Sequence, residues 1–239
     1  GRTGPEQGEA AQRGAAAIGR MDEDQASCGV QRMHAAPSVH DERHEVARDQ
    51  QARPRARPRV AELALIDAPE LIIGSNLHAG AIRVLGATSR SGDLTLQNDG
   101  GSGGIDIQAA LDVGTGTLAL SSGGDITQSS GGAITAHSLL ARAGGSVLLA
   151  DAGNNVAATT LAGSAGGDFE YEDVDALAIG SVSGLGMDAS SNGLASFGAT
   201  GISAGGDVFV RNLAGDMTLN AGVSGVNIDL VTANTLQNA

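Results

Sequence analysis

The sequence predicts an all-β fold, a parallel β-helix (solenoid) over residues 60–239, preceded by a largely disordered arm over residues 1–59. Three observations predict it. Short alternating apolar runs fill the chain after residue 60, a Gly-Asp or Gly-Ser step recurs before many of them, and aromatic residues make up only 2% of the composition.

The alternating runs are the strand signal. "GDLTLQNDGG", "GIDIQAA" and "GTLALSSGG" place an apolar side chain at every second position and end in Gly, Asn, Asp or Ser. Such runs are typical of strands separated by turns. Amphipathic segments of helical length are missing, and no proline follows Pro69. Since proline cannot donate a backbone hydrogen bond, its absence suits strands that are paired on both sides.

The recurring step indicates a repeat. A gap of 21 residues separates residues 125 and 146, and a gap of 22 separates 146 and 168. The gap of 39 from residue 168 to 207 is near twice that length. Repeats of ~20–30 residues are typical of solenoids in which each repeat forms one layer, and the segment would form about eight or nine layers of about three strands each. The steps are Gly92-Asp93, Gly124-Asp125, Gly145-Ser146, Gly167-Asp168, Gly206-Asp207 and Gly215-Asp216.

The composition supports thin, regular layers. The chain has 239 residues, 41% of them hydrophobic, with 37 Gly and no Trp. A globular core of this size normally uses aromatic rings to fill irregular volume, whereas Ala, Val, Leu and Ile with glycine at the corners suit a stack of rungs. An antiparallel β-sandwich is the alternative fold, but its hairpins do not require a sequence repeat of 21–22 residues.

Charge divides the chain and excludes some partners. Residues 1–60 contain 10 Arg and 9 acidic residues, whereas residues 61–239 contain 4 Arg and 18 acidic residues. An acidic body argues against nucleic acid and against anionic membrane surfaces, because both require clustered basic residues. No apolar run approaches the ~20 residues that span a bilayer, so no membrane insertion is expected. Cys28, the single cysteine, excludes an internal disulfide.

Residues 1–59 differ in character from the rest. They are rich in Ala, Arg, Gln and Glu and lack a sustained period of 3.6 or 2 residues. Pro54 and Pro58 make the basic stretch Arg53–Arg59 extended. We expect a disordered arm, and the alternative is a translated upstream or out-of-frame segment that is not native to this protein. The chain begins at Gly1 and its first Met is Met21, so a fragment of a longer protein is expected.

Two stretches carry a family resemblance. "VAELALIDAPELIIGSNLHAGAIRVLGA" and "GGDITQSSGGAITAHSLLARAGGSVLLADAGNNVAATTLAGSAGGDFEYEDVDALAIGSVSGLG" together resemble the repeat region of filamentous haemagglutinin-like adhesins, large exoproteins of Gram-negative bacteria. The resemblance covers roughly residues 60–239. It implies a right-handed β-helix that is exported by two-partner secretion through an outer-membrane transporter and displayed at the cell surface for adhesion to a host or neighbouring cell.

One departure limits what the resemblance implies. The family's secretion domain carries Asn-Pro motifs, and this chain has no Asn-Pro dipeptide. We therefore expect a segment of the shaft, with a structural and cell-adhesion role and without catalysis. Its uncapped ends would favour end-to-end self-association. The alternatives are a β-helix enzyme acting on polysaccharide, and a gene fragment with no independent function.

The stretch "GDFEYEDVDALAIG" contains a cluster of five acidic residues and two of the four aromatic residues of the chain. Alternation places the rings of Phe169 and Tyr171 on one face and the neighbouring acids on the other. We expect a structural rung with a loop that contacts a partner through Glu172, Asp173 and Asp175. No catalytic, cofactor-binding or metal-binding residues are predicted, and a calcium contact or a catalytic carboxylate at this loop is the alternative.

Two motifs resemble functional sites elsewhere. Residues 201–205, "GISAG", match the nucleophile-elbow pattern, but no His follows the serine and no helix is expected there. Residues 98–106, "NDGGSGGID", resemble a calcium-binding nonapeptide, but Ile105 stands where the motif requires Asp. The first is predicted to be a corner of the solenoid. Calcium binding is not predicted at the second, because the motif occurs once and such sites need stacked copies.

Overall fold

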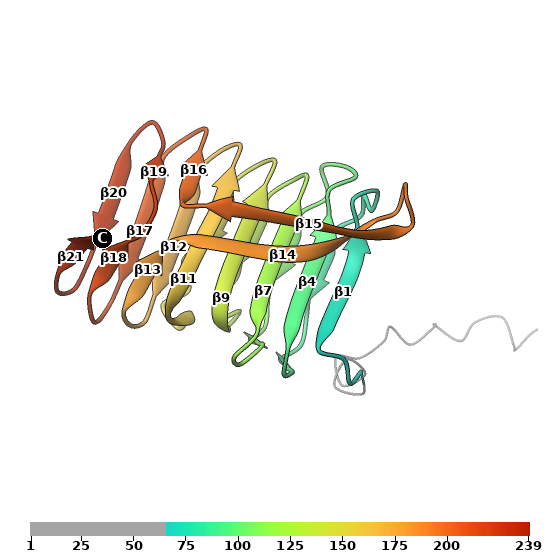
Figure 1. The fold of residues 1–239 in the computed structure, drawn as a ribbon, viewed down its shortest axis with the longest axis horizontal. Helices are drawn as coiled ribbons and strands as arrows, with labels where there is room; N and C mark the ends of the chain where they lie inside the picture. Colours follow the sequence, from blue (N-terminus) through green and yellow to red (C-terminus); the bar gives the residue numbers. More distant parts are fainter. Residues whose placement is uncertain (1–65) are drawn as a thin grey trace, which may run out of the picture. The chain divides into compact units, whose positions relative to one another are not determined.

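The computed structural model describes residues 66–239, apart from the side chains of residues 157–159. These residues form 21 β-strands and no helix. Most strands stack in parallel, one turn of the chain above the last, as a β-solenoid of about eight turns (Figure 1). The predicted all-β solenoid is thereby confirmed, and the arm predicted over residues 1–59 lies outside the described residues.

Two parallel sheets enclose the core, and a separate antiparallel hairpin adds a third, two-stranded sheet. The larger sheet has twelve strands: β1 (Glu70–Ser75), β3 (Thr88–Ser89), β4 (Asp93–Asn98), β6 (Leu111–Asp112), β7 (Thr117–Ser122), β9 (Ile134–Ala143), β11 (Asn155–Ala165), β13 (Leu177–Ile179), β16 (Ile202–Ala204), β18 (Met217–Leu219), β19 (Val223–Ser224) and β21 (Leu236–Asn238). The second sheet has seven: β2 (Ile82–Val84), β5 (Ile105–Ile107), β8 (Ile126–Gln128), β10 (Val147–Leu149), β12 (Phe169–Asp173), β17 (Val208–Asn212) and β20 (Ile228–Val231). The hairpin consists of β14 (Ser181–Asp188) and β15 (Gly193–Thr200).

The core consists of apolar columns, meaning residues that lie in register in successive turns. Parallel stacking places equivalent residues above one another, so an inward apolar residue of one turn packs on its counterpart in the next. In the seven-stranded sheet one such column extends through all seven strands. Its members are Ile82, Ile105, Ile126, Val147, Phe169, Val208 and Ile228.

The recurring Gly-Asp step marks two different corners of the solenoid, which corrects part of the predicted spacing. Asp93 begins β4 in the twelve-stranded sheet, whereas Asp125 directly precedes β8 in the seven-stranded sheet. These two steps, which are 32 residues apart, therefore mark different corners and do not give the length of one turn. The 39-residue gap from Asp168 to Asp207 is also not two turns, because Phe169 and Val208 are partners in adjacent turns.

The additional residues in that turn form the hairpin. β13 stacks on β11 through the pair Leu161 and Ile179, and β16 stacks on the same strand through the pair Gly163 and Ile202. β13 and β16 are thus two halves of one rung, and residues 181–200 leave the rung between them. The N–H of Gly201 donates to the carbonyl of Gly180 at 2.6 Å and closes the base of the insertion.

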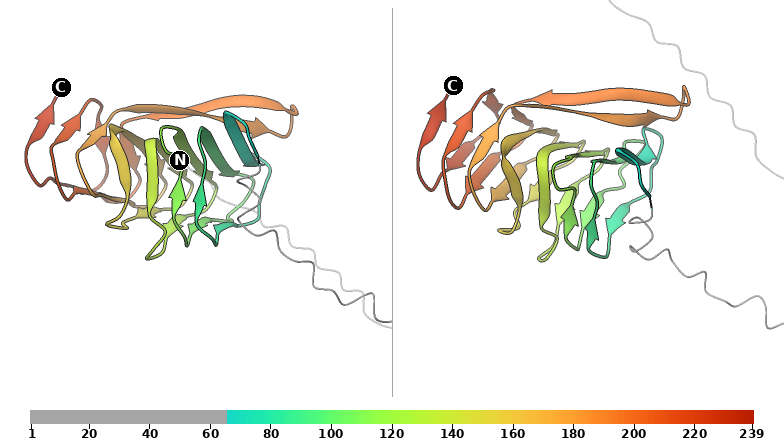
Figure 2. Two further views of the ribbon diagram at one scale, coloured as in Figure 1. Left: turned by 90° about the horizontal axis from the view of Figure 1, so that it is seen from below. Right: turned by 60° about the horizontal axis from the view of Figure 1, so that its bottom comes forward.

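The hairpin lies along the outside of the twelve-stranded sheet, across its strands (Figures 1 and 2). It contacts β1, β4, β7, β9 and β11, so it extends back toward the first turn. A small apolar cluster joins it to the sheet, with Val182, Phe197 and Ala199 of the hairpin packed against Ala119, Leu140 and Ala162. Glycine is required at 184 for this close approach, because a Cβ there would lie 2.7 Å from the Cβ of Ala119.

The tip of the hairpin is hydrogen-bonded to the first turn. The N–H of Asn76 donates to the carbonyl of Met187 at 3.0 Å, and its side-chain amide donates to the carboxylate of Asp188 at 2.8 Å. The N–H of Ala189 donates back to the Asn76 side chain at 2.9 Å. The N–H of Met187 donates to the Gln97 side chain at 2.9 Å. Residues 112 positions apart in the sequence are thus joined, and the hairpin straps the first turns to the rung from which it leaves.

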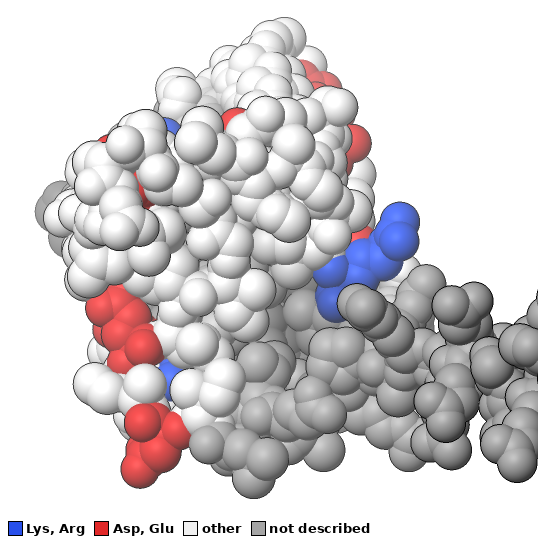
Figure 3. All heavy atoms as spheres, turned by 90° about the vertical axis from the view of Figure 1, so that its right-hand side faces the viewer, with Lys and Arg blue, Asp and Glu red and all other residues white. Residues whose placement is uncertain are grey.

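Both end turns of the described solenoid present apolar residues. β20 and β21 each pair on one side only within residues 66–239. The last turn leaves large hydrophobic residues exposed, among them Val226 at 71% and Ile228 at 46%. The first turn, at the opposite end, exposes Leu77 at 61% and Leu85 at 56%, and the described surface seen there is mostly uncharged (Figure 3). End-to-end self-association stays a prediction.

Candidate functional site

The acidic loop lies at the end of β12, where the chain leaves the seven-stranded sheet. Phe169 and Tyr171 are completely buried, as alternation predicts. Glu172 faces outward, but it is only 7% exposed and forms an ion pair with Arg211 of the next turn at 2.6 Å. Asp173 lies on the inner face with the rings and is 0% exposed. Of the three residues predicted to contact a partner, Asp175 alone is partly exposed.

The Asp173 carboxylate holds two turns together. One oxygen accepts the Tyr171 hydroxyl at 2.6 Å and the backbone N–H of Val156 at 2.9 Å. The other accepts the backbone N–H of Asp175 at 3.1 Å. Three donors around one buried carboxylate satisfy both its oxygens. This arrangement gives Asp173 a structural role, and a ligand has no access to the group.

Burial shifts the protonation of this pair. Desolvation raises the pKa of Asp173 to about 6, and this outweighs the hydrogen bonds from Tyr171, Val156 and Asp175, which lower it. Burial also raises the pKa of Tyr171 well above its usual value, and the neighbouring Asp173 carboxylate raises it further. The tyrosine therefore stays protonated and can donate to Asp173 throughout the ordinary pH range.

The raised pKa of Asp173 predicts a pH dependence of stability. The folded chain binds a proton at Asp173 more tightly than the unfolded chain, in which the pKa is near 3.8. This pKa difference adds up to about 3 kcal/mol to the free energy of unfolding. The contribution is fully present below about pH 4 and is lost as the pH rises through about 6. Urea denaturation between pH 4 and 7.5 measures this, and the Asp173→Asn variant should show a flatter profile. Parallel profiles for the two proteins would contradict the assignment.

Buried asparagines at the corners were missed by the sequence reasoning. The side-chain amide of Asn98 donates to the carbonyls of Gly80, Gly103 and Gly104. Asn212, which is in register with Asp173, donates to the carbonyls of Ala214 and Gly215. Each amide satisfies carbonyls where a strand ends and the chain turns. The signal in the sequence is an Asn directly after an alternating run, as in "LTLQN" and "VFVRN".

The Gly-Asp step also has a structural explanation. The carboxylate of Asp168 accepts the backbone N–H of Asp207 in the next turn at 2.9 Å, and that of Asp125 accepts the N–H of Ser146 at 2.8 Å. The glycine makes room for this bond, because a Cβ at Gly206 would lie 2.1 Å from the Asp168 carboxylate. Each step therefore links two turns at a corner, and these acidic residues act in the scaffold.

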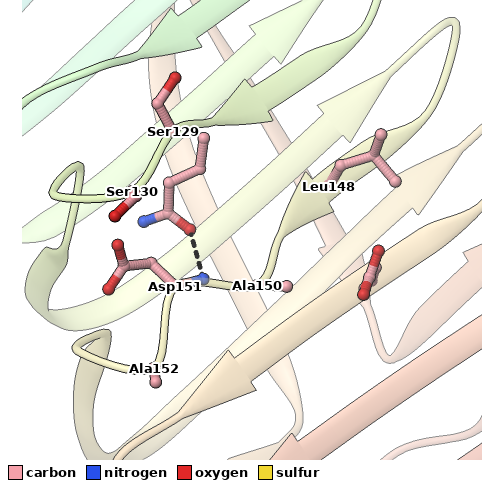
Figure 4. Close-up of a pocket in the computed structure, with 8 residues that line it drawn as sticks. Ser129, Ser130, Leu148, Ala150, Asp151 and Ala152 are labelled. Carbon is pink, nitrogen blue, oxygen red and sulfur yellow. Dashed lines mark hydrogen bonds between the residues drawn. The ribbon is translucent and has the colours of Figure 1, made fainter.

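A groove of about 480 Å³ lies on the seven-stranded face (Figure 4). Its polar groups already bond one another. The Gln128 side chain accepts the N–H of Asp151 at 3.0 Å, and the Asp151 carboxylate accepts the N–H groups of Gly131 and Gly153. These bonds tie adjacent corners together, and Leu148 forms an apolar side of the groove. We therefore assign Gln128 and Asp151 to structure.

A second groove of about 210 Å³ lies between the hairpin and the twelve-stranded sheet. It is lined by Glu70, Asp93, Thr95, Thr117, Ala119, Ser183, Gly184, Leu185 and Ser196. Glu70 and Asp93 are in register on adjacent strands. Burial raises the pKa of Glu70, and the negative charge of Asp93 raises it further. The groove therefore places two carboxylates beside one strand of the hairpin.

The motifs that resemble functional sites form rungs and corners. Ser203 of "GISAG" lies in β16, and Gly201 adopts a φ of 73° where the hairpin returns to the rung. In "NDGGSGGID", Asn98 is the buried corner residue described above. Among residues 66–239 no cluster of three or more His, Cys, Asp or Glu residues is arranged to hold a metal ion.

Comparison with known proteins gives no match to any protein-family model, any curated protein or any solved structure. Within residues 66–239, no helix has the length and apolar character needed to cross a bilayer.

Proposed function

We propose that the chain is a shaft segment of a secreted or surface-displayed bacterial adhesin, with a structural and cell-adhesion role and without catalysis. The observation that carries the proposal is the solenoid of about eight turns whose first turns are strapped to a later rung by the β14–β15 hairpin. Every turn is hydrogen-bonded to its neighbours, which favours a spacer that holds its shape.

The polar groups of the described corners also support a scaffold. The carboxylates of Asp125, Asp168 and Asp173 bond backbone N–H groups, and Glu172 pairs with Arg211. The resemblance of residues 60–239 to filamentous haemagglutinin-like repeats supports export through an outer-membrane transporter and display at the cell surface. The receptor would be a component of a host or neighbouring cell.

Display on a non-adherent Gram-negative cell tests the proposal. Cells carrying the full chain as a surface passenger should bind cultured epithelial cells or one another at least several-fold more than cells carrying an unrelated β-domain of equal length. Attachment at the control level would contradict the adhesive role. Release of reducing ends from a polysaccharide panel by the purified chain, abolished by Asp175→Asn, would replace the proposal with the polysaccharide-acting enzyme.

A further inference from the structure

One edge of the hairpin, the side of β14 that faces away from β15, lies beside the second groove. This open edge of β14 pairs with no other strand among residues 66–239. The N–H and carbonyl of Met187 bond Gln97 and Asn76, so they point away from β15. The carbonyl of Gly180 accepts from Gly201, so the even-numbered residues of β14 face β15. Because backbone direction alternates along a strand, Ser183 and Leu185 present their N–H and carbonyl groups at the open edge. Both residues also line the groove.

The groove wall opposite this edge is acidic, and no ion pair within residues 66–239 neutralises its two carboxylates. Glu70 and Asp93 lie in register at the start of β1 and β4. Arg90 is close by, but its guanidinium donates to the backbone carbonyls of Ala68 and Asp93. The ion pair found among residues 66–239 joins Glu172 and Arg211, at another corner. The Asp93 carboxylate accepts the backbone N–H of Thr117 at 2.7 Å, but neither Glu70 nor Asp93 has an ion-pair partner among residues 66–239. A strand added beside β14 would therefore meet two carboxylates that have no counter-charge from the described residues.

The chain itself contains a segment with the matching pattern. Residues 54–59, "PRARPR", lie outside the described residues. In an extended strand, Arg55, Arg57 and Arg59 share one face and one edge, and Pro54 and Pro58 share the opposite face and edge. Proline is tolerated in a strand only where its nitrogen faces an unpaired edge. With the arginine edge toward β14, both prolines would face solvent.

We propose that residues 54–59 of this chain add to the open edge of β14 as a third strand, with their arginine side chains directed at Glu70 and Asp93. The backbone groups of Ser183 and Leu185 gain hydrogen-bond partners, and the two carboxylates gain counter-charges. Length permits it, because residues 60–69 span at most about 35 Å and lead directly to Glu70, which lines the groove. The inference does not depend on an adhesive role.

Hydrogen exchange on the full chain tests the proposal at single amides. The amides of Ser183 and Leu185 should exchange about tenfold faster or more when Arg55, Arg57 and Arg59 are all replaced by Gln, because strand pairing protects them. The amides of Val182 and Gly184 face β15 and serve as internal controls that should not change. The matched control protein carries the same three-charge change elsewhere, as Arg20→Gln, Arg32→Gln and Arg43→Gln.

A second pair of variants tests the acidic wall. The double variant Glu70→Gln with Asp93→Asn should raise the exchange rates of the Ser183 and Leu185 amides. The control double variant Asp106→Asn with Asp229→Asn, on the other sheet, should leave both rates unchanged. Equal exchange at Ser183 and Leu185 in the wild-type and triple-arginine variants would overturn the proposal. So would protection that falls on hundredfold dilution, because the added strand would then come from a second copy.

Discussion

Replacing Phe169 by alanine is expected to lower the free energy of unfolding by about 3–5 kcal/mol. The ring is completely buried in the apolar column between Val147 and Val208. It also lies against Gly163, where an added Cβ would be 2.6 Å from the ring. Alanine would leave a cavity between turns whose backbones are fixed by hydrogen bonding, so the neighbouring rungs cannot collapse to fill it. Urea denaturation followed by circular dichroism measures the loss.

Phe209 provides the matched control. It lies in the next turn, in register with Glu170 on the outer face, and is only partly buried. Phe209→Ala should cost less than about 1.5 kcal/mol, because less apolar surface is returned to water. Equal losses for the two phenylalanines would contradict the inward position of Phe169.

Replacing Asn154 by alanine is expected to cost about 3 kcal/mol or more. Its side chain is completely buried and links three turns. The oxygen accepts the N–H of Ile134 at 2.9 Å, and the amide donates to the carbonyls of Leu149 and Glu172 at 3.0 and 3.1 Å. It also exchanges hydrogen bonds with the Gln128 side chain. Alanine would leave several buried groups unpaired, and each costs about 1–3 kcal/mol.

The adjacent Asn155 allows a direct comparison. It is only partly buried at the start of β11, so Asn155→Ala should change the free energy of unfolding by less than about 1 kcal/mol. Thermal and urea unfolding of both variants give the difference. Similar losses at the two positions would place the stabilisation in the strand itself, away from the Asn154 side chain.

Alternation and the recurring steps were enough to predict the solenoid, because each residue repeats the environment of its counterpart one turn below. The inward position of Phe169 and Tyr171 followed from the same period. Asp173 was harder to place. It lies two residues after Tyr171, so alternation places it on the same inward face. A carboxylate inside a core, however, is expected only where several hydrogen-bond donors surround it. Those donors come from the Tyr171 hydroxyl and from Val156 in the turn below, and no local pattern in the sequence reports that contact.

The hairpin was missed for a different reason. Residues 181–200 alternate and are rich in small residues, as the rungs are, so a 20-residue insertion resembled one more turn. The features that distinguish it are Gly184 and Gly186, where a Cβ would meet Ala119 and Gln97 respectively. Those partners are far away in the sequence, so the need for glycine becomes evident only when the sheet beneath is in place.

The strap changes how the rod would respond to tension along its axis. In a simple stack every interface between turns carries the full load, and the weakest one yields first. The hairpin joins Asn76 in the first turn to the rung of β13 and β16, so the interfaces from β1 to β11 share the load with a second connection. Beyond that rung, β20 and β21 have no such connection among the described residues. A pulled molecule is therefore expected to peel from its last turns while the strapped turns hold.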